Sequence, residues 1–225
     1  FLTREDLRAN AMVAVLGYGV AEKLFGSLPA VGKNIKLNGK TNIPDDDEAV
    51  SGAFASVEDA VRLGADAVGA MGMPGSKFES QMLPYLSDLI SQCAEWNMPV
   101  MAEMLPAGFE NPKEFWTPEN ITNACRIGAE LGVDFIKTTY TGDVDSFARV
   151  IEQVYVPIVV LGGTKSDDPR DLLVQIHGAM QAGARGVACG RNIYQWKDPA
   201  KMVQAVAAII HDGATVDDAL DLLEQ

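Results

Sequence analysis

The sequence has little of what marks a secreted, membrane-bound or zinc-binding protein. Its three cysteines, Cys93, Cys125 and Cys189, contain no CxxC pair, so neither a disulfide framework nor a zinc knuckle is indicated. The two histidines, His177 and His211, are too far apart for a local metal motif. No apolar run approaches the ~20 residues of a membrane helix, and no signal peptide is visible. We therefore expect a soluble cytoplasmic protein with reduced thiols.

Positive charge is also scarce. The formal net charge is −13 at pH 7. Nucleic acids and anionic membranes bind to basic faces, so we expect neither as a partner. If the substrate contains phosphate, the positive charge that binds it must be concentrated in one place.

A repeated local pattern organises the chain. With 225 residues, of which 48% are hydrophobic, the chain can bury one large core. Helix-like segments end at Gly64, Gly132 and Gly183 and pass directly into apolar strands. Glycine fits the left-handed position just past a helix. Two further strands begin at Pro99 and Pro157, and proline is tolerated at the first position of a strand.

Seven candidate strands follow, starting near residues 12, 34, 66, 99, 134, 157 and 185. Their spacing is typical of βα units, and the continuous apolar strands suit a parallel sheet covered by helices. We expect a single α/β domain over residues 1–225 with the (β/α)8 barrel fold; a doubly wound open sheet is the alternative. The expected helices are 56–63, 79–96, 118–131, 144–154 and 169–182.

The count of strands falls one short of a barrel. A (β/α)8 barrel needs eight strands, and the sequence offers seven. The chain opens on residues 3–7, which are typical of a helix. We therefore expect the first βα unit to be missing from this sequence.

Lys137 is the most informative single residue. It lies in the apolar, β-branched and aromatic segment 134–140, which indicates a buried strand. Burial without a partner favours the neutral amine, which is a nucleophile that can form a Schiff base with a carbonyl substrate. The alternative is that Lys137 lies at the end of the strand and pairs with Asp134 or Asp143.

Two glycine-containing turns follow the last two strands, where functional groups gather in a barrel. They are Gly162-Gly163 and Gly190-Arg191. Free backbone N–H groups and a guanidinium fork are suited to binding a phosphate. The alternative is that the glycines serve only tight turns.

Glu103 is a second ionisable residue expected inside the sheet. By strand alternation it shares a face with Met101 and Leu105. A carboxylate there is either an acid/base catalyst or the partner of Lys36 or Lys137.

Several of these segments together resemble the archaeal-type class I fructose-bisphosphate aldolases. The wider group includes enzymes similar to deoxyribose-phosphate aldolase and to heptulosonate synthase. The resemblance extends over roughly residues 10–215 and implies a (β/α)8 barrel that assembles into pentamer-based rings, often decamers. The matching segments are Lys36–Thr41, Ser56–Val61, Met73–Ser76, Asp134–Lys137, Tyr140–Asp143, Gly162–Gly163 and Gly190–Asn192.

The resemblance also implies a chemistry. Lys137 would be the Schiff-base lysine acting on a sugar phosphate. No metal or other cofactor is implied, because the iminium itself serves as the electron sink. The residues that would hold the substrate phosphate are Gly162, Gly163, Gly190 and Arg191, and the candidate supporting residues are Lys36, Asn38 and Tyr140.

The chain departs from the family at the general acid. The family's tyrosine lies in a Trp-x-Tyr-Pro-Arg-Gly stretch, where this chain has Glu103 at the tryptophan, Leu105 at the tyrosine and Ala107 at the arginine. Leucine cannot transfer a proton, and general acid–base catalysis typically contributes about 10²–10⁴ in rate. Glu103 is the candidate replacement and Tyr140 a weaker one; alternatively, the substrate differs.

Three functions stay open at this stage. The first is a class I aldolase that cleaves or forms a C–C bond in a phosphorylated ketose or a related sugar phosphate. The second is a relative that uses the same lysine for acyl transfer or another carbonyl-transfer reaction. The third is a non-catalytic phosphosugar-binding paralogue.

Overall fold

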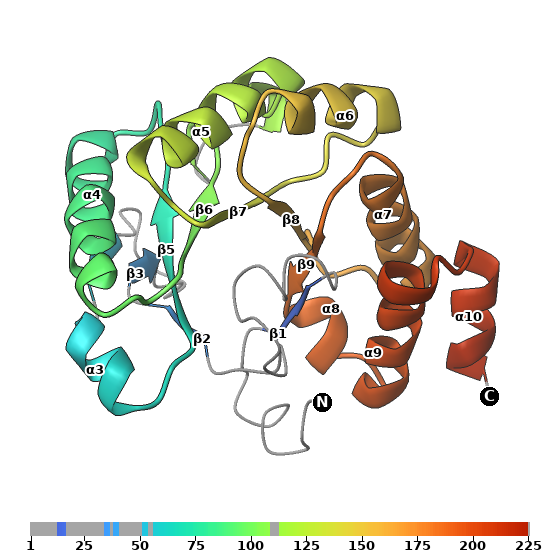
Figure 1. Cartoon of the computed structure of the whole chain (residues 1–225). Coiled ribbons are helices and arrows are strands. Elements are labelled where there is room, and N and C mark those ends of the chain that lie inside the picture. The colour runs from blue at the N-terminus through green and yellow to red at the C-terminus, as the bar shows by residue number, and fades with distance from the viewer. Residues whose placement is uncertain are drawn as a thin grey trace, which may run out of the picture. The chain divides into compact units, whose positions relative to one another are not determined.

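The computed structural model describes residues 13–16, 34–36, 38–40, 51–53, 56–108 and 113–224 (Figure 1). The helix expected at residues 3–7 lies outside these ranges, and the missing first βα unit stays a prediction. The chain divides into two compact units. Unit 1 comprises residues 1–31, 137–153 and 157–225, and unit 2 comprises residues 32–136 and 154–156. The single domain over residues 1–225 likewise stays a prediction.

Unit 2 is built on the strand order β2-β5-β6-β7, in which β2, β5 and β6 are parallel. Helices α4 and α5 cover β5 and β6 (Figure 1). A separate antiparallel pair, β3 with β4, was not predicted. The bounds are β2 Asn34–Lys36, β3 Asn38–Lys40, β4 Ser51–Ala53, α3 Val57–Arg62, β5 Ala67–Gly72, α4 Glu79–Glu95, β6 Val100–Met104, η1 Lys113–Phe115, α5 Pro118–Leu131 and β7 Phe135–Thr138.

Unit 1 takes up the last two residues of β7 and continues the order β7-β8-β9-β1. Strands β8 and β9 are parallel. Helices α7, α9 and α10 pack side by side (Figure 1). The bounds are β1 Val13–Leu16, α6 Val144–Glu152, β8 Ile158–Leu161, α7 Pro169–Gln181, β9 Gly186–Cys189, α8 Arg191–Tyr194, α9 Pro199–Ala207, the π-helical turn η2 Ala208–Asp212 and α10 Val216–Glu224.

Local sequence signals explain where these elements begin and end. Ser56 and Asp59 form a reciprocal capping box at the start of α3. Asp143 caps α6 and Asp168 caps α7 through their side chains. The predicted glycine joints adopt left-handed conformations, for example φ +104° at Gly132, directly after α5. Each βα unit is therefore delimited by its own residues.

The predicted elements are largely confirmed. All seven strands start within one residue of the expected positions, and the five expected helices are present. One expectation was wrong: β1 pairs antiparallel with β9, not parallel. A strand at the edge of a sheet satisfies its backbone groups in either direction, and its apolar sequence does not specify which.

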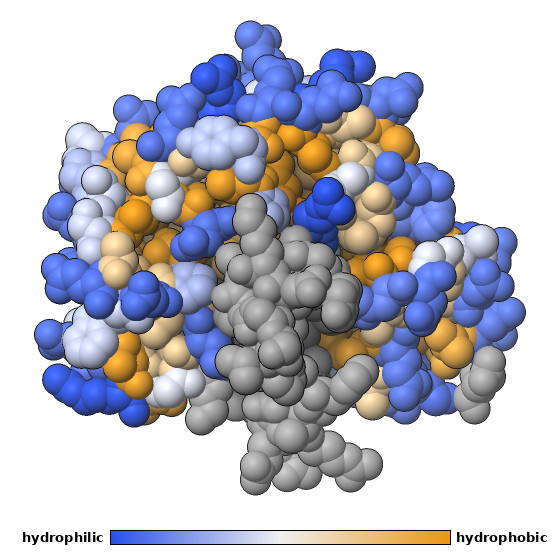
Figure 2. Space-filling model, viewed as in Figure 1, coloured by the Kyte–Doolittle hydropathy of each residue, from blue (hydrophilic) through white to orange (hydrophobic). Residues whose placement is uncertain are grey.

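Apolar side chains fill the interior, and hydrophilic side chains cover much of the surface. The buried side chains are mainly aliphatic, with Phe135, Phe147 and Leu173 among the largest that are fully enclosed. Figure 2 shows hydrophilic side chains over much of the surface of the helices. None of the helices in the described ranges combines the length and the apolar character that a membrane-spanning segment requires.

Candidate active site

Lys137 is buried in strand β7, with only 6% of its surface exposed. The two carboxylates proposed as its alternative partners have other roles. Asp134 Oδ2 accepts a hydrogen bond from Val100 N at 2.7 Å, which ties the start of β7 to the start of β6. Asp143 Oδ1 accepts from Ser146 N at 2.8 Å and caps α6. Both carboxylates therefore have structural roles of their own.

Cys189, at the end of β9, is the ionisable neighbour of Lys137 in unit 1. Burial raises the pKa of the Cys189 thiol to about 12, and the positive charge of Lys137 only partly opposes this effect. The thiol therefore stays protonated near neutral pH. A protonated thiol is a poor nucleophile, so Cys189 is unsuited to nucleophilic attack near neutral pH.

Gly162 allows the ends of β8 and β9 to approach each other closely. A Cβ atom added to Gly162 would lie 2.3 Å from the Cβ of Cys189, closer than two carbon atoms can pack. The next residue, Gly163, has a φ of +66°, in the left-handed region. The glycines therefore do serve a tight turn, and this structural role is compatible with phosphate binding by the same turn.

Asn192, in helix α8, is a site residue that the sequence prediction missed. Its side chain is 7% exposed, and its Nδ2 donates to the carbonyl oxygens of Gly162 at 2.6 Å and Thr164 at 3.1 Å. Its Oδ1 accepts from Ser166 N at 3.0 Å. The segment Gly190–Asn192 resembles the family, but no local pattern indicates these three hydrogen bonds.

Arg191 is the cation of this region. It is exposed and starts α8, directly after Gly190. Gly190 has little spare room, because an added Cβ would lie 3.1 Å from Cε1 of Tyr194. Among the described residues, no carboxylate pairs with Arg191, whereas the nearby Lys165 pairs with Asp167 at 3.5 Å. No carboxylate among the described residues therefore competes with an anion for this guanidinium.

Glu103, in unit 2, is buried in β6 with 6% exposure. Its neighbour Met104 packs its side chain over Gly72 of β5 and Gly128 of α5, so Met104 faces the helices. Because side chains alternate along a strand, Glu103 points to the opposite face of the sheet. This position suits a carboxylate that acts away from the helix layer.

The segment after β6 has an uncommon backbone conformation. Leu105 is fully buried and donates its backbone N–H to Gly72 O. Ala107 has a φ of +58°, a left-handed conformation that is uncommon for a residue with a Cβ. Its backbone N–H donates to Pro74 O at 2.7 Å, which holds this turn against the loop after β5.

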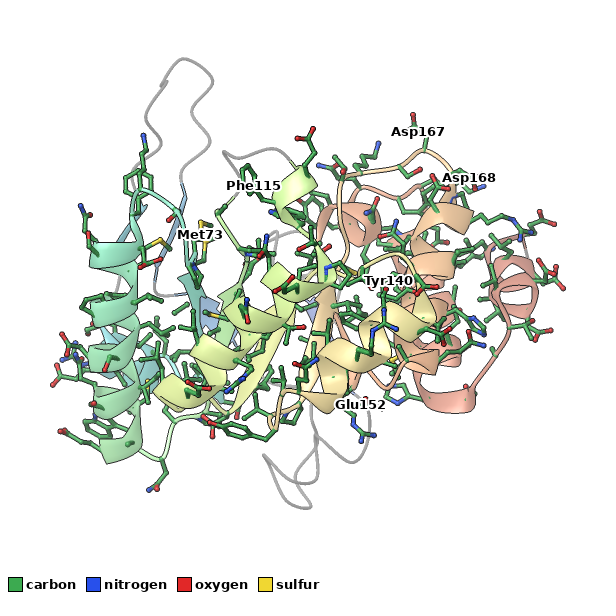
Figure 3. The ribbon with its side chains drawn as sticks, turned by 90° about the horizontal axis from the view of Figure 1, so that it is seen from above. Met73, Phe115, Tyr140, Glu152, Asp167 and Asp168 are labelled. Atoms are coloured by element: carbon green, nitrogen blue, oxygen red, sulfur yellow. The ribbon has the colours of Figure 1, made fainter. Side chains whose placement is uncertain are left out.

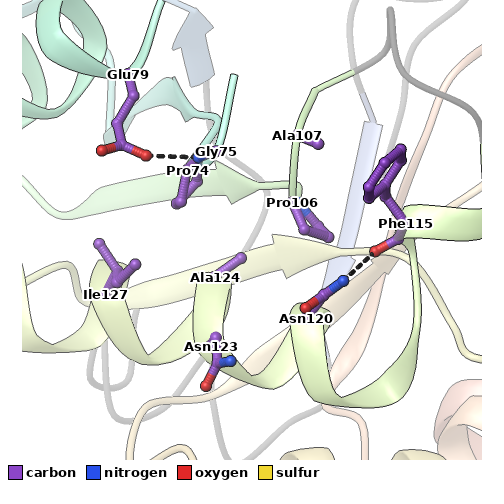
Figure 4. A pocket seen from close by; sticks show the side chains of 10 residues that line it. All are labelled: Pro74, Gly75, Glu79, Pro106, Ala107, Phe115, Asn120, Asn123, Ala124 and Ile127. Atoms are coloured by element: carbon purple, nitrogen blue, oxygen red, sulfur yellow. Dashed lines mark hydrogen bonds between the residues drawn. The ribbon is translucent and has the colours of Figure 1, made fainter. Parts of the chain in front are cut away.

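A cavity of about 470 Å³ lies beside these two loops in unit 2 (Figure 4). Two hydrogen bonds organise its wall: Gly75 N donates to Glu79 Oε2, and Asn120 Nδ2 donates to Phe115 O. No local pattern of residues predicts this cavity. It is lined by Pro74, Gly75, Glu79, Pro106, Ala107, Phe115, Asn120, Asn123, Ala124 and Ile127.

Tyr140 packs into the helix layer of unit 1 (Figure 3). Its ring makes an edge contact with Phe147 of α6, with 5.3 Å between centroids. A Cβ atom added to Gly178 of α7 would lie only 2.5 Å from the Tyr140 hydroxyl oxygen. Burial raises the pKa of the Tyr140 phenol, helped by the charge of Asp143. These contacts give Tyr140 a packing role, and its supporting role in proton transfer stays a prediction.

The remaining sequence candidates are not placed by the structure. Lys36 belongs to strand β2 and Asn38 to strand β3, but the structure describes only the backbone of these two residues. In the ranges whose side chains are described, there is no group of three or more histidine, cysteine, aspartate or glutamate residues that could hold a metal ion.

Comparisons with known proteins identify the family. The model of the DeoC/LacD family of aldolases matches residues 4–196. The class 1 fructose-bisphosphate aldolase of Thermoproteus tenax is 38% identical over 206 residues, which cover 91% of this chain and 76% of the relative. The 2-amino-3,7-dideoxy-D-threo-hept-6-ulosonate synthase of Halobacterium salinarum is 34% identical over 219 residues, which cover 97% of this chain and 81% of the relative.

A solved structure gives the same indication. An archaeal fructose-1,6-bisphosphate aldolase, with its catalytic lysine covalently bound to the carbinolamine intermediate of the substrate, has a TM-score of 0.73 and 38% identity. The match covers 85% of this chain and 75% of that one. The fold is thus that of the α/β-barrel aldolases, and the chain belongs to the DeoC/LacD family of aldolases, which are carbon–carbon lyases.

Proposed function

We propose that this protein is a class I aldolase in which Lys137 forms a Schiff base with a phosphorylated ketose. The observation that supports this most is the burial of Lys137 in β7. A lysine amine can add to the carbon of a carbonyl group and form a Schiff base. The solved relative with a lysine-bound carbinolamine shows that chemistry for a protein 38% identical to this one.

The proposed reaction begins with addition of Lys137 Nζ to the ketone carbon of the substrate. Loss of water from the carbinolamine gives an iminium. A base then removes the proton of the hydroxyl two carbons from the iminium carbon. The bond between that hydroxyl-bearing carbon and the carbon adjacent to the iminium breaks. Its electron pair moves into the iminium to give an enamine, and an aldehyde leaves. Protonation of the enamine and hydrolysis release the second product and restore the amine.

Proton transfer needs a group other than the family's tyrosine, because Leu105 stands at that position. We propose Glu103, whose carboxylate is buried and directed away from the helices. A carboxyl group within reach of the substrate can act as a general acid or base.

The phosphate of the substrate is proposed to bind at Gly162, Gly163, Gly190 and Arg191. The left-handed turn at Gly163 and the available guanidinium of Arg191 support this position. A chain of net charge −13 repels anions at long range, so a local cation and free N–H groups are needed to bind one.

The substrate itself is proposed to be fructose bisphosphate or a related sugar phosphate. The Thermoproteus tenax relative is named for fructose bisphosphate, and the Halobacterium salinarum relative is named as a heptulosonate synthase. The replacement of the family's aromatic and arginine residues by Glu103, Leu105 and Ala107 favours including both substrate types in any assay. By resemblance to the family, we further propose a cytoplasmic homo-oligomer, a pentamer or decamer, which light scattering would test.

The test is borohydride reduction in the presence of a ketone substrate, followed by intact mass measurement. Dihydroxyacetone phosphate, fructose bisphosphate and a panel of other sugar phosphates are compared on wild type and on Lys137→Met. We expect one reduced adduct per chain in the wild type and none in Lys137→Met, while Lys197→Met, which removes an exposed lysine, behaves as wild type. Absence of any adduct from folded wild-type protein would refute the proposal.

A further inference from the structure

We propose that Asn192 is a positioning residue that sets the loop after β8 for binding a substrate phosphate. This inference rests on the proposed function. The three hydrogen bonds of its amide reach Gly162, Thr164 and Ser166, which together span the whole turn. One buried side chain on α8 thus determines the path of a loop that lies 26 to 30 residues earlier in the chain.

The carbonyl groups that Asn192 holds determine where the backbone N–H groups point. In a trans peptide, the C=O of one residue and the N–H of the next point in opposite directions. The carbonyls of Gly162 and Thr164 point at Asn192, so the N–H groups of Gly163 and Lys165 point away from it. Neither N–H donates to another backbone or side-chain group in the described part of the chain.

The two N–H groups therefore form a donor pair on the side of the loop opposite Asn192. The left-handed conformation of Gly163 is typical of backbone turns whose N–H groups converge on an anion. The loop is also fixed at its far end, because Ser166 Oγ donates to Asp171 Oδ2 at 2.6 Å and accepts from Asp168 N at 3.1 Å. Figure 3 shows Asp167 and Asp168 at the start of α7.

Asn192 cannot be replaced by another polar residue at no cost. Both of its amide hydrogens are used on carbonyl groups and its oxygen is used on an N–H, so the side chain is fully satisfied while buried. A carboxylate of the same shape would place a negatively charged oxygen against two carbonyl oxygens. The loop would then turn one or both peptides, and the donor pair would be lost.

The test compares a phosphorylated ketone with its unphosphorylated counterpart. Borohydride trapping of dihydroxyacetone phosphate and of dihydroxyacetone is measured on wild type and Asn192→Asp. We expect the half-saturating concentration of the phosphorylated ketone to rise about 10- to 100-fold, as for the loss of hydrogen bonds to a charged group. The maximal trapping rate and all values for dihydroxyacetone should change less than about threefold.

A pH arm adds a readout that a merely structural role would not change. When the new carboxyl group is protonated, it can again donate a hydrogen bond to Gly162 O. The difference between wild type and Asn192→Asp in affinity for dihydroxyacetone phosphate should therefore become smaller as the pH falls. Asn97→Asp is the matched control, because it adds the same charge at an exposed amide after α4 and should behave as wild type. If Asn192→Asp does not fold, Asn192→Ser, whose side chain is too short to reach both carbonyls, replaces it.

Two results would overturn the proposal: an unchanged preference for the phosphorylated ketone, or an equal loss for both ketones. Calorimetric titration with inorganic phosphate separates this inference from the proposed function. If the wild type traps neither ketone, the Schiff-base proposal fails. Weaker phosphate binding by Asn192→Asp than by wild type would still support the role of Asn192, and equal binding would refute it.

Discussion

Different contacts fix the ends of the strands in the two units. In unit 1, Gly162 faces the rigid Cβ of Cys189, and the following loop is fixed by three hydrogen bonds from Asn192. In unit 2, Gly72 and Gly128 face the flexible end of the Met104 side chain, which can move aside. The loops after β5 and β6 are joined by backbone bonds that do not depend on side-chain identity.

Both units contain segments that resemble the family: Lys137 and the glycine turns lie in unit 1, and Met73–Ser76 lies in unit 2. The departures from the family pattern at Glu103, Leu105 and Ala107 all lie in unit 2. Backbone-held loops accept new side chains without losing their path. We infer that substrate recognition diverges in unit 2, while the covalent and anion-binding chemistry of unit 1 is retained.

The largest expected effect separates proton transfer from Schiff-base formation. Glu103→Gln should slow substrate cleavage by about 10²–10⁴, the usual contribution of a general acid or base. Borohydride trapping of dihydroxyacetone phosphate should stay within a few-fold of wild type. Steady-state assays and trapping rates on the same preparation measure both. Glu95→Gln, at the exposed end of α4, is the control, and equal cleavage rates in both variants would remove Glu103 from the mechanism.

The next effect tests the contrast in packing directly. Gly162→Ala should lower the free energy of unfolding by about 3 kcal/mol, because the new methyl meets a Cβ that cannot move. Gly72→Ala should cost about 1 kcal/mol, because Met104 can adopt another rotamer. Urea denaturation measures both. Similar losses for the two variants would show that the units are equally rigid.

A smaller effect concerns the pH dependence of stability in unit 1. The native Cys189 thiol has a pKa of about 12, against a reference value of 9.0. The unfolded thiol therefore ionises first, and the stability that the thiol contributes below pH 9 is lost as the pH rises toward 12. Between pH 8 and 10, wild type should lose about 1 kcal/mol more than Cys189→Ala. Parallel curves for the two proteins would place the thiol in contact with water.

The smallest effect concerns the backbone strain at Ala107 in unit 2. Ala107→Gly should raise the free energy of unfolding by about 0.5–1 kcal/mol, because glycine adopts a positive φ without a steric penalty. Ala94→Gly, at an exposed position inside α4, should instead lower it by about 1 kcal/mol. Thermal unfolding of both variants gives the comparison, and a loss at both positions would argue against strain at Ala107.

Much of the fold could be predicted from sequence because its signals are local. The glycines after helices, the prolines before strands and the capping box at Ser56 each act within a few residues. Helices α8, α9 and α10 were not predicted, although Asp198 caps α9 and Pro199 is its first residue. The direction of β1 could not be predicted either, since an apolar strand of four residues contains no information on orientation.

The site was only partly predictable because some of its features are tertiary. Burial of Lys137 and Glu103 followed from the apolar strands around them. The role of Asn192 depends on contacts with residues at least 26 positions away, which no local pattern indicates. The orientation of Tyr140 depends on the space left by Gly178 in α7. The cavity beside the loops after β5 and β6 likewise exists only once those loops are folded.

The most direct test of the covalent chemistry is to locate the adduct along the chain. Wild-type protein is reduced with borohydride in the presence of dihydroxyacetone phosphate, digested and sequenced by tandem mass spectrometry. We predict a single modified residue, Lys137, with the mass of one reduced dihydroxyacetone phosphate. An adduct on Lys36 or on another lysine, or modification spread over several exposed lysines, would contradict the assignment of Lys137 as the Schiff-base residue.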